Sequence, residues 1–352
     1  MSLAPNGAIR PPLFRKSFEL QSKVQRRIEK ARLYITAQGL YEVNINGQKV
    51  GDHVLAPGWT SYNHHLNYQT FDVTRLLQSG ENIMAVEVGE GWFCTRLGFL
   101  GGKRCIYGAR PALLAQLEIF WDTGDSSVII NSDCSWTTNV GPRISSEIYD
   151  GEAYNANSEI SGWNVRGFDD SDWNAVDKLD FPTCQLLSSK GPPVRKMEVL
   201  GVKEVIQSPT GKKILDFGQN MVGWVRIRVQ GSKGDMITLT HTEVLDEKGE
   251  CATGPLRDCR AQDTLILSGE ALDWEPKFTF HGFRYVQVDG WPSGEPLQSC
   301  EAVVIHNDLE LTGTFTCSNQ DINKLHENIR WGMKGNFLSI PTVRSTTSLI
   351  FY

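Results

Sequence analysis

The feature that most constrains this chain is a period-two alternation of apolar residues, interrupted at short intervals by turn residues. Two such runs lie at 33–35 and 41–45, and the second leads into the dipeptide Asn46-Gly47. Because successive side chains of a strand point to opposite faces, this alternation predicts strands that bury one face. Asn-Gly between two alternating runs predicts a tight β-hairpin at this point.

The same pattern continues through most of the chain. Residues 112–121 and 126–133 form another alternating pair around a Thr-Gly-Asp turn, and 213–229 ends in a further alternating run. Turns spaced by about 10 residues are typical of β-sandwiches and jelly rolls. Long helical patterns do not follow the strands, which argues against a parallel α/β sheet. We predict an all-β fold with two β-sandwich, jelly-roll-like domains.

A Ser/Gly/Pro stretch at 188–196 separates two β-rich blocks and is typical of a domain boundary. We therefore predict a first domain at 1–190 and a second at 194–306. The remaining segment, 307–352, has a different pattern.

Within that segment, four apolar residues spaced four apart predict one helix at 319–337: Leu325, Ile329, Met333 and Phe337. Asn319 or Ser318 would cap its N-terminus.

Composition excludes several classes of partner. The 352 residues carry a formal net charge of −6, whereas nucleic acids and anionic membrane surfaces attract basic stripes. The sequence has no run of 18 apolar residues, so no membrane-spanning helix is expected. The N-terminus lacks the apolar core of a secretory signal, which predicts a cytoplasmic protein. The eight cysteines form no Cys-x-x-Cys pair, and we expect reduced thiols.

Four long segments resemble the α-L-rhamnosidases of bacteria and fungi: LYITAQGLYEVNINGQKVGDHVLAPGWTSYNHHLNYQTFDVT, ILDFGQNMVGWVRIRV, FTFHGFRYVQVDGWP and TGTFTCSNQDINKLHENIRWGMKGNFLSIPT. The likeness runs from residue 12 to residue 342. It implies the β-sandwich domains that precede an (α/α)-barrel in that family, with 307–352 as a remnant of the barrel. In the family the barrel holds the catalytic carboxylates, and here VRSTTSLIFY follows NFLSIPT. Since glycoside hydrolysis needs two carboxylates, the resemblance implies a chain that does not hydrolyse rhamnosides. One departure from the family is that Asn155 and Asn157 stand where it usually has Asp and Arg.

The connection at 89–111 combines aromatic and basic residues. Long connections in compact domains are usually functional, and aromatic faces beside guanidinium groups suit a sugar or a flat oxygenated ligand. The alternative is a packed loop that supports a hydrolase domain. Together with the FTFHGFRY segment, this loop predicts a ligand groove with Arg104, Tyr107 and His281 as catalytic donors. The predicted substrate-binding residues are Trp92, Phe93, Arg96, Phe99, Trp224 and Arg284.

Two of these residues have a structural interpretation as well. His281 is also consistent with a hydrogen-bonded core histidine, and Trp224 with a core tryptophan. No metal or cofactor is expected. His53, His64 and His65 lack a third-ligand pattern, and adjacent side chains on a strand point apart.

Three functions fit these observations. The first is a non-hydrolytic enzyme of fungal specialised metabolism. In overall form the chain resembles the hetero-Diels–Alderases of tropolone-sesquiterpenoid biosynthesis, which join a tropolone quinone methide to a humulene-type sesquiterpene. Such a cycloaddition needs orientation and a hydrogen-bond donor rather than a cofactor. The second is a rhamnoside-binding module that uses Trp92, Trp163 and Asn155, and the third is an inactive truncated rhamnosidase. The partner is a small apolar or aromatic molecule, or a sugar, and the barrel-facing surface offers a site for self-association.

Overall fold

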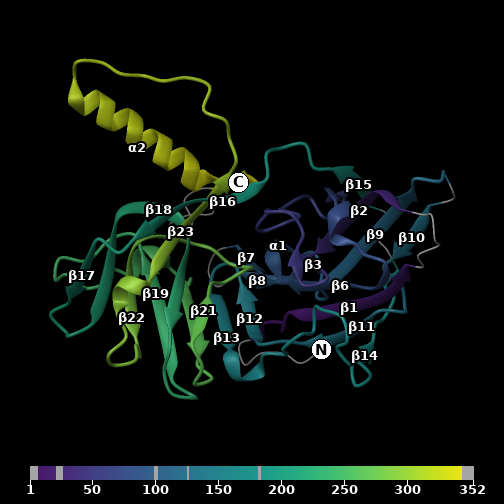
Figure 1. The fold of residues 1–352 in the computed structure, drawn as a ribbon. Helices are drawn as coiled ribbons and strands as arrows, with labels where there is room; N and C mark the ends of the chain where they lie inside the picture. Colours follow the sequence, from purple (N-terminus) through teal and green to yellow (C-terminus); the bar gives the residue numbers. More distant parts are fainter. Residues whose placement is uncertain (1–6, 21–26, 99–101, 125–126, 181–183, 343–352) are drawn as a thin grey trace. The chain divides into compact units, whose positions relative to one another are not determined.

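The chain folds into two units of β-structure, each with its own hydrophobic core (Figure 1). The computed structural model describes residues 7–20, 27–98, 102–124, 127–180 and 184–342. The first unit comprises Met1–Leu97, Lys103–Ser146 and Ser158–Lys190. The second comprises Gly98–Gly102, Glu147–Asn157 and Gly191–Tyr352.

The first unit is a sandwich of two sheets. One sheet has the order β14 (Asn174–Ala175), β11 (Thr137–Val140), β1 (Pro12–Leu20), β6 (Gly80–Gly89), β3 (Leu40–Ile45), β4 (Gln48–Lys49). The other has the order β10 (Val128–Asn131), β9 (Ala112–Trp121), β2 (Ile28–Gln38), β5 (His65–Asp72), β15 (Gln185–Ser188). Short elements complete the unit: η1 (Thr74–Leu76), α1 (Gly91–Cys94), β7 (Arg96–Leu97), β8 (Lys103–Arg104), β12 (Arg143–Glu147) and η2 (Ala156–Ser158), of which η2 begins and β12 ends in the second unit.

The alternating residues form the core of this unit, as the sequence predicts. Leu33 and Ile35 on β2 are buried, and so are Val43 and Ile45 on β3. The predicted hairpin turn lies between β3 and β4, with φ of 51° at Asn46 and 82° at the following glycine. Asparagine and glycine are the residues that adopt this left-handed conformation most readily.

The second unit is built on a long curled sheet. After β12, its strands have the order β13 (Gly151–Asn155), β20 (Gln262–Ile266), β19 (Met236–Thr242), β22 (His281–Asp289), β18 (Lys213–Val229), β23 (Glu301–Asn307), β16 (Val194–Gly201), with β17 (Glu204–Gln207) and β21 (Leu272–Trp274) on β18. Pairing is antiparallel except between β13 and β20. The connections contain η3 (Gly254–Leu256) and η4 (Leu297–Ser299). Together the two units confirm the predicted all-β fold class.

The change of unit after Lys190 falls beside the predicted domain boundary. The segment Glu147–Asn157, which lies inside the predicted first domain, groups instead with the second unit because β13 pairs with β20. The segment 307–342 also groups with the second unit.

The predicted C-terminal helix is present as α2 (Gln320–Asn336), and β24 (Phe337–Leu338) and β25 (Ile340–Pro341) follow it. The Asn319 side chain accepts from the amides of Asp321 and Ile322, which is the predicted N-cap. Near the C-terminal end of α2, Gly335 is buried next to Val222.

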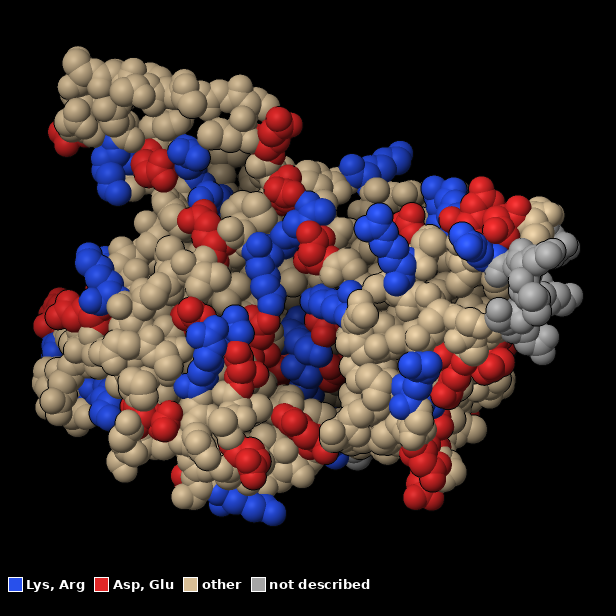
Figure 2. All heavy atoms as spheres, in the orientation of Figure 1, with Lys and Arg blue, Asp and Glu red and all other residues tan. Residues whose placement is uncertain are grey.

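The apolar stripe of α2 faces outward. The exposed fractions of Leu325, Ile329 and Met333 are 57%, 53% and 49%. Figure 2 shows Lys, Arg, Asp and Glu side chains along this helix, next to uncharged surface. Among the described helices, none is both long and apolar enough to cross a membrane.

Candidate functional site

The first unit contains a cavity of ≈ 980 Å³. Its walls come from the start of β1, the end of β2, the start of β9, β11 and the segment 174–180. Apolar lining residues include Phe14, Leu113 and Val176. Polar and charged lining residues include Arg10, Gln38, Arg110, Asn139, Asp177 and Asp180. The cavity therefore combines apolar walls with donors and acceptors, as small-molecule sites do.

Two arginines that line this cavity have N–H groups that donate no hydrogen bond to a described residue. Arg10 donates from Nη2 to the Gly141 carbonyl at 2.9 Å, but its buried Nε has no hydrogen-bond partner in the described part of the chain. Arg110 is exposed, and no described residue forms an ion pair or hydrogen bond with it. A buried donor without a partner costs free energy that a ligand oxygen can recover.

Among the described residues of the 89–111 connection, Trp92, Phe93 and Tyr107 contact other aromatic rings of the first unit. Trp92 is 1% exposed and stacks on Trp59, with ring centroids 5.8 Å apart. Phe93 is also buried, and its ring meets Tyr62 edge-on at 5.2 Å. Tyr107 contacts the same tyrosine at 4.9 Å. These rings contact protein rather than solvent, which matches the alternative of a packed loop.

Among the basic residues of this connection, Arg104 has a buried intramolecular partner. Arg104 binds both carboxylate oxygens of Glu90 at 2.5 Å, and Glu90 is completely buried. Glu90 accepts in addition from the Ile9 amide. Arg96 lies opposite Arg104 in the β7–β8 pair. Phe99 lies outside the described residues.

In the second unit, the predicted site residues Trp224 and Arg284 also form hydrogen bonds with acidic side chains. Trp224 is 1% exposed and donates from Nε1 to Glu275 at 3.0 Å. Arg284 forms two hydrogen bonds of 2.9 Å with Asp216 and lies over the Tyr285 ring. The groove predicted from the sequence combines the 89–111 connection with the FTFHGFRY segment, which belong to different units. Its contacts with a ligand remain a prediction.

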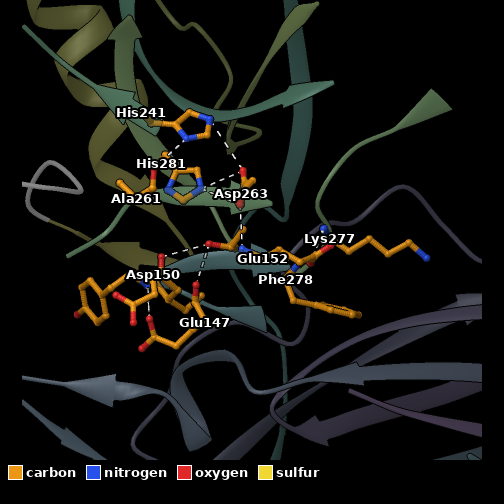
Figure 3. Close-up of polar contacts among 12 residues, drawn as sticks. Glu147, Asp150, Glu152, His241, Ala261, Asp263, Lys277, Phe278 and His281 are labelled. Atoms are coloured by element: carbon orange, nitrogen blue, oxygen red, sulfur yellow. Dashed lines mark hydrogen bonds and ion pairs between the residues drawn. The ribbon is translucent and has the colours of Figure 1, made fainter. Parts of the chain in front are cut away.

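The second unit brings His281 into a buried polar cluster (Figure 3). Its Nε2 lies 3.2 and 3.1 Å from the two oxygens of Asp263 on β20. His241 on β19 stacks on the His281 ring with a centroid distance of 4.1 Å, and its Nε2 lies 3.9 Å from Asp263 Oδ2. The three side chains are at most 1% exposed. This arrangement matches the interpretation of His281 as a hydrogen-bonded core histidine.

The electrostatics of the cluster follow from its burial. Burial, aided by the neighbouring His281 ring, lowers the pKa of His241 to about 3, so this imidazole is neutral. Burial acts to raise the pKa of Asp263. The interactions with His281 and His241 and the amide of Glu152 outweigh it and hold that pKa below its usual range.

Backbone amides hold the carboxylates around this cluster. The Glu152 amide donates to Asp263 Oδ1 at 2.9 Å, and the Glu152 carboxylate accepts from the amides of Lys277 and Phe278 at 3.1 and 3.3 Å. Glu147 accepts in the same way from the amide of Asp150 at 2.6 Å (Figure 3). Both glutamates are buried.

In the described part of the chain, the side chains placed closely enough to share a metal ion are His241, Asp263 and His281. The histidines considered from the sequence, His53, His64 and His65, are not in such a group. Sequence reasoning missed the buried cluster because its members are 18 to 40 residues apart along the chain and meet only through strand pairing.

Three family models match successive parts of the chain. Residues 26–198 match the alpha-L-rhamnosidase N-terminal domain, and 206–306 match the bacterial alpha-L-rhamnosidase concanavalin-like domain. Residues 310–343 match the bacterial alpha-L-rhamnosidase 6 hairpin glycosidase domain. The chain belongs to the α-L-rhamnosidase family.

Relatives of known sequence and structure agree with this assignment. An α-L-rhamnosidase of Streptomyces avermitilis is 43% identical over 330 residues, which cover 93% of this chain and 32% of the relative. One from Formosa agariphila is 39% identical over 95% of this chain and 36% of the relative. The chain thus spans about a third of the length of these relatives.

Two crystal structures of α-L-rhamnosidases resemble the chain closely. The native enzyme of Aspergillus terreus has a TM-score of 0.93 and 51% identity, covering 98% of this chain and 40% of that protein. The Streptomyces avermitilis enzyme complexed with L-rhamnose has a TM-score of 0.92 and 42% identity, covering 97% and 33%. The α-L-rhamnosidase resemblance of the sequence is therefore confirmed over both units.

Proposed function

We propose that this chain is the β-structured region of an α-L-rhamnosidase-type protein, and that its first unit binds the rhamnoside on which the whole protein acts. The single observation that carries this proposal is the ≈ 980 Å³ cavity of the first unit. Its size suits a sugar with part of its aglycone, since ligand pockets commonly span about 300–1,000 Å³.

The side chains that line the cavity are of the types that bind a neutral carbohydrate. Each sugar hydroxyl both donates and accepts, so a sugar site needs donors and acceptors side by side. Arg10 and Arg110 supply donors, and Asp177 and Asp180 supply acceptors. Phe14 and the neighbouring aliphatic side chains cover the apolar face of a sugar ring.

Calorimetric titration of the chain with L-rhamnose and with a rhamnosyl disaccharide tests this proposal, with D-glucose as the comparison sugar. We expect saturable binding of the rhamnosyl ligands. Arg110→Ala should weaken that binding by about 10-fold or more, because hydrogen bonds to charged groups contribute roughly 1.5–3 kcal/mol. Arg75→Ala is the matched control, since Arg75 is exposed in the same unit and does not line the cavity. Equal binding by Arg110→Ala and wild type, or no binding by wild type, would refute the proposal.

The finer prediction from the sequence, a hetero-Diels–Alder reaction on this scaffold, has no contact that favours it over carbohydrate binding. Two of the donors chosen for that reaction already serve buried carboxylates, Arg104 on Glu90 and His281 on Asp263. The assay for this prediction is the yield and enantiomeric ratio of cycloadduct with native and heat-denatured protein. Identical yields from the two samples would dismiss it.

A further inference from the structure

We infer that His241, Asp263 and His281 form a binding site for a divalent transition-metal ion, with Zn²⁺ as the ion that the donor set fits best. The site lies wholly in the second unit and is independent of the carbohydrate cavity. It rests on three observations: the tautomer of His241, the spacing of the ligand atoms, and the backbone that holds them.

The tautomer of His241 leaves a lone pair directed into the cluster. Its Nδ1 lies 3.1 Å from the Ala261 carbonyl oxygen, an atom that can only accept, so Nδ1 carries the proton. Nε2 of the neutral ring is therefore an acceptor, and it is buried without a hydrogen-bond partner among the described residues. Its neighbour, Asp263 Oδ2 at 3.9 Å, is an acceptor as well. A cation between these two atoms would satisfy both.

The spacing of the ligand atoms fits a small tetrahedral ion. All three donor atoms lie within 4.8 Å of one another. Two ligands of a tetrahedral Zn²⁺ ion with bonds of 2.0–2.1 Å are about 3.3 Å apart. The distances from Asp263 Oδ2 to His281 Nε2 and His241 Nε2, 3.1 and 3.9 Å, bracket that value. As a ligand, His281 would present the lone pair of Nε2, with the ring proton on Nδ1.

The donor set selects the kind of ion. Two imidazole nitrogens and one carboxylate favour zinc or a neighbouring first-row metal, whereas Ca²⁺ and Mg²⁺ prefer oxygen ligands alone. Three protein ligands leave the fourth tetrahedral position to water.

Backbone groups around the cluster hold the ligands as they do in metal sites. The Ala261 carbonyl fixes the His241 ring, and the Glu152 amide fixes the Asp263 carboxylate. Ala261 has a φ of 48°, an unusual value for a residue with a side chain, and it thereby directs its carbonyl to His241. Gly151 has a φ of 101°, and a Cβ there would lie 2.9 Å from Asp263 Oδ1. Next to the cluster, the backbone therefore has one residue in an unusual conformation and one position where only glycine fits.

Metal analysis of the intact chain tests this inference. The protein is produced without a polyhistidine tag, and its bound metals are measured by mass spectrometry. After treatment with chelator, Co²⁺ is added and the visible absorption of tetrahedral cobalt is recorded. We expect about one tightly bound Zn²⁺ per chain, or uptake of about one Co²⁺ with that absorption, and a higher Tm with metal, because an ion that binds only the folded state stabilises it.

Two variants separate this site from adventitious binding to the cysteines. His241→Gln removes a ligand and should abolish uptake of that ion, the cobalt absorption and the rise in Tm. His306→Gln is the matched control, since His306 is a buried histidine of the same unit outside the cluster, and it should retain all three. Metal-free protein that shows neither cobalt absorption nor a Tm shift at saturating Zn²⁺ would overturn the inference. Uptake that is unchanged in His241→Gln would overturn it as well.

Discussion

Glu87 and Glu90 of the first unit and Asp263 of the second unit are buried acidic side chains with different kinds of partner. In the first unit, Glu87 binds Arg143 through two contacts of 2.9 Å, and Glu90 binds Arg104. In the second unit, Asp263 faces two imidazoles instead of a guanidinium. Arginine is always charged and offers only donors, so a pair with glutamate is complete by itself. Histidine can offer a lone pair, so the second arrangement has room for a cation.

The comparison distinguishes charged side chains that stabilise the fold from polar side chains that are available to bind a ligand. Arg104 and Arg284, two of the arginines that we predicted from the sequence as ligand contacts, pair with buried acids. In the cavity of the first unit, Arg10 and Arg110 have donor capacity that no described residue uses. In the second unit the candidate site is the buried cluster itself.

Removing a guanidinium from the first unit should have the largest effect on stability. Arg143→Met removes the guanidinium that contacts both carboxylate oxygens of Glu87, which is 4% exposed. We expect a loss of about 3–5 kcal/mol in the free energy of unfolding, because breaking a buried ion pair by removing one partner is costly. Arg226→Met, which breaks the exposed pair with Asp273, should cost about 1 kcal/mol or less. Urea denaturation of both variants gives the comparison, and equal losses would show that burial does not distinguish the two pairs.

The backbone next to the second unit's cluster should be nearly as sensitive. A methyl group at Gly151 would lie 2.0 Å from the Gln262 carbonyl oxygen, so Gly151→Ala must displace β20 and with it Asp263. We expect a loss of roughly 3 kcal/mol in stability. Gly249→Ala is the control. It also has a positive φ but meets nothing closer than 3.9 Å, and it should cost about 1 kcal/mol. Similar midpoints for the two variants in thermal denaturation would contradict the importance of this close approach.

Thiol reactivity should separate exposed from buried cysteines in both units. The eight cysteines are free, and burial raises the pKa of the Cys94 thiol far above its usual range and that of Cys300 to about 12. Cys134 is exposed. Because the thiolate is the reactive form, Cys134 should be alkylated roughly 100-fold faster than the other two at pH 8. Mass spectrometry of peptides after timed alkylation measures these rates, and uniform labelling in the native protein would show that the buried thiols are accessible.

The outward face of α2 should give the smallest effect. Leu325→Gln and Ile329→Gln replace side chains that are about half exposed, and each should change stability by less than about 0.5 kcal/mol. Val222→Ala is the contrasting substitution, since Val222 is buried beneath Gly335, and it should cost about 1 kcal/mol or more. Equilibrium denaturation of the three variants tests this order. A large loss on replacing Leu325 would mean that this face has a partner in the chain.

Local sequence signals predicted the parts of the fold that depend on local chemistry. Alternation identified the strands, Asn46-Gly47 identified a hairpin, and the four-residue spacing with Asn319 identified α2. The burial of the 89–111 aromatics was not predictable in this way. Their partners, Trp59 and Tyr62, come from a different loop, and composition alone does not show whether a ring faces a ligand or another ring.

The candidate sites could not be predicted from the sequence for the same reason. His241, Asp263 and His281 come from three paired strands and share no spacing that a motif search detects. The cavity is lined by segments from residue 9 to residue 180, and of the connection that the sequence singled out it includes the last three residues, Ala109, Arg110 and Pro111.

Hydrogen–deuterium exchange on the intact chain tests most directly whether sugar and metal bind at different units. With a saturating rhamnosyl disaccharide, exchange should slow in peptides that cover the cavity lining at 109–114 and 136–140. Exchange in β19 and β20 should not change. With saturating Zn²⁺ the result should be reversed, with protection of β19, β20 and the start of β22 alone. Protection of β19 and β20 by the disaccharide, or the absence of protection with both ligands, would contradict the assignment of the two sites.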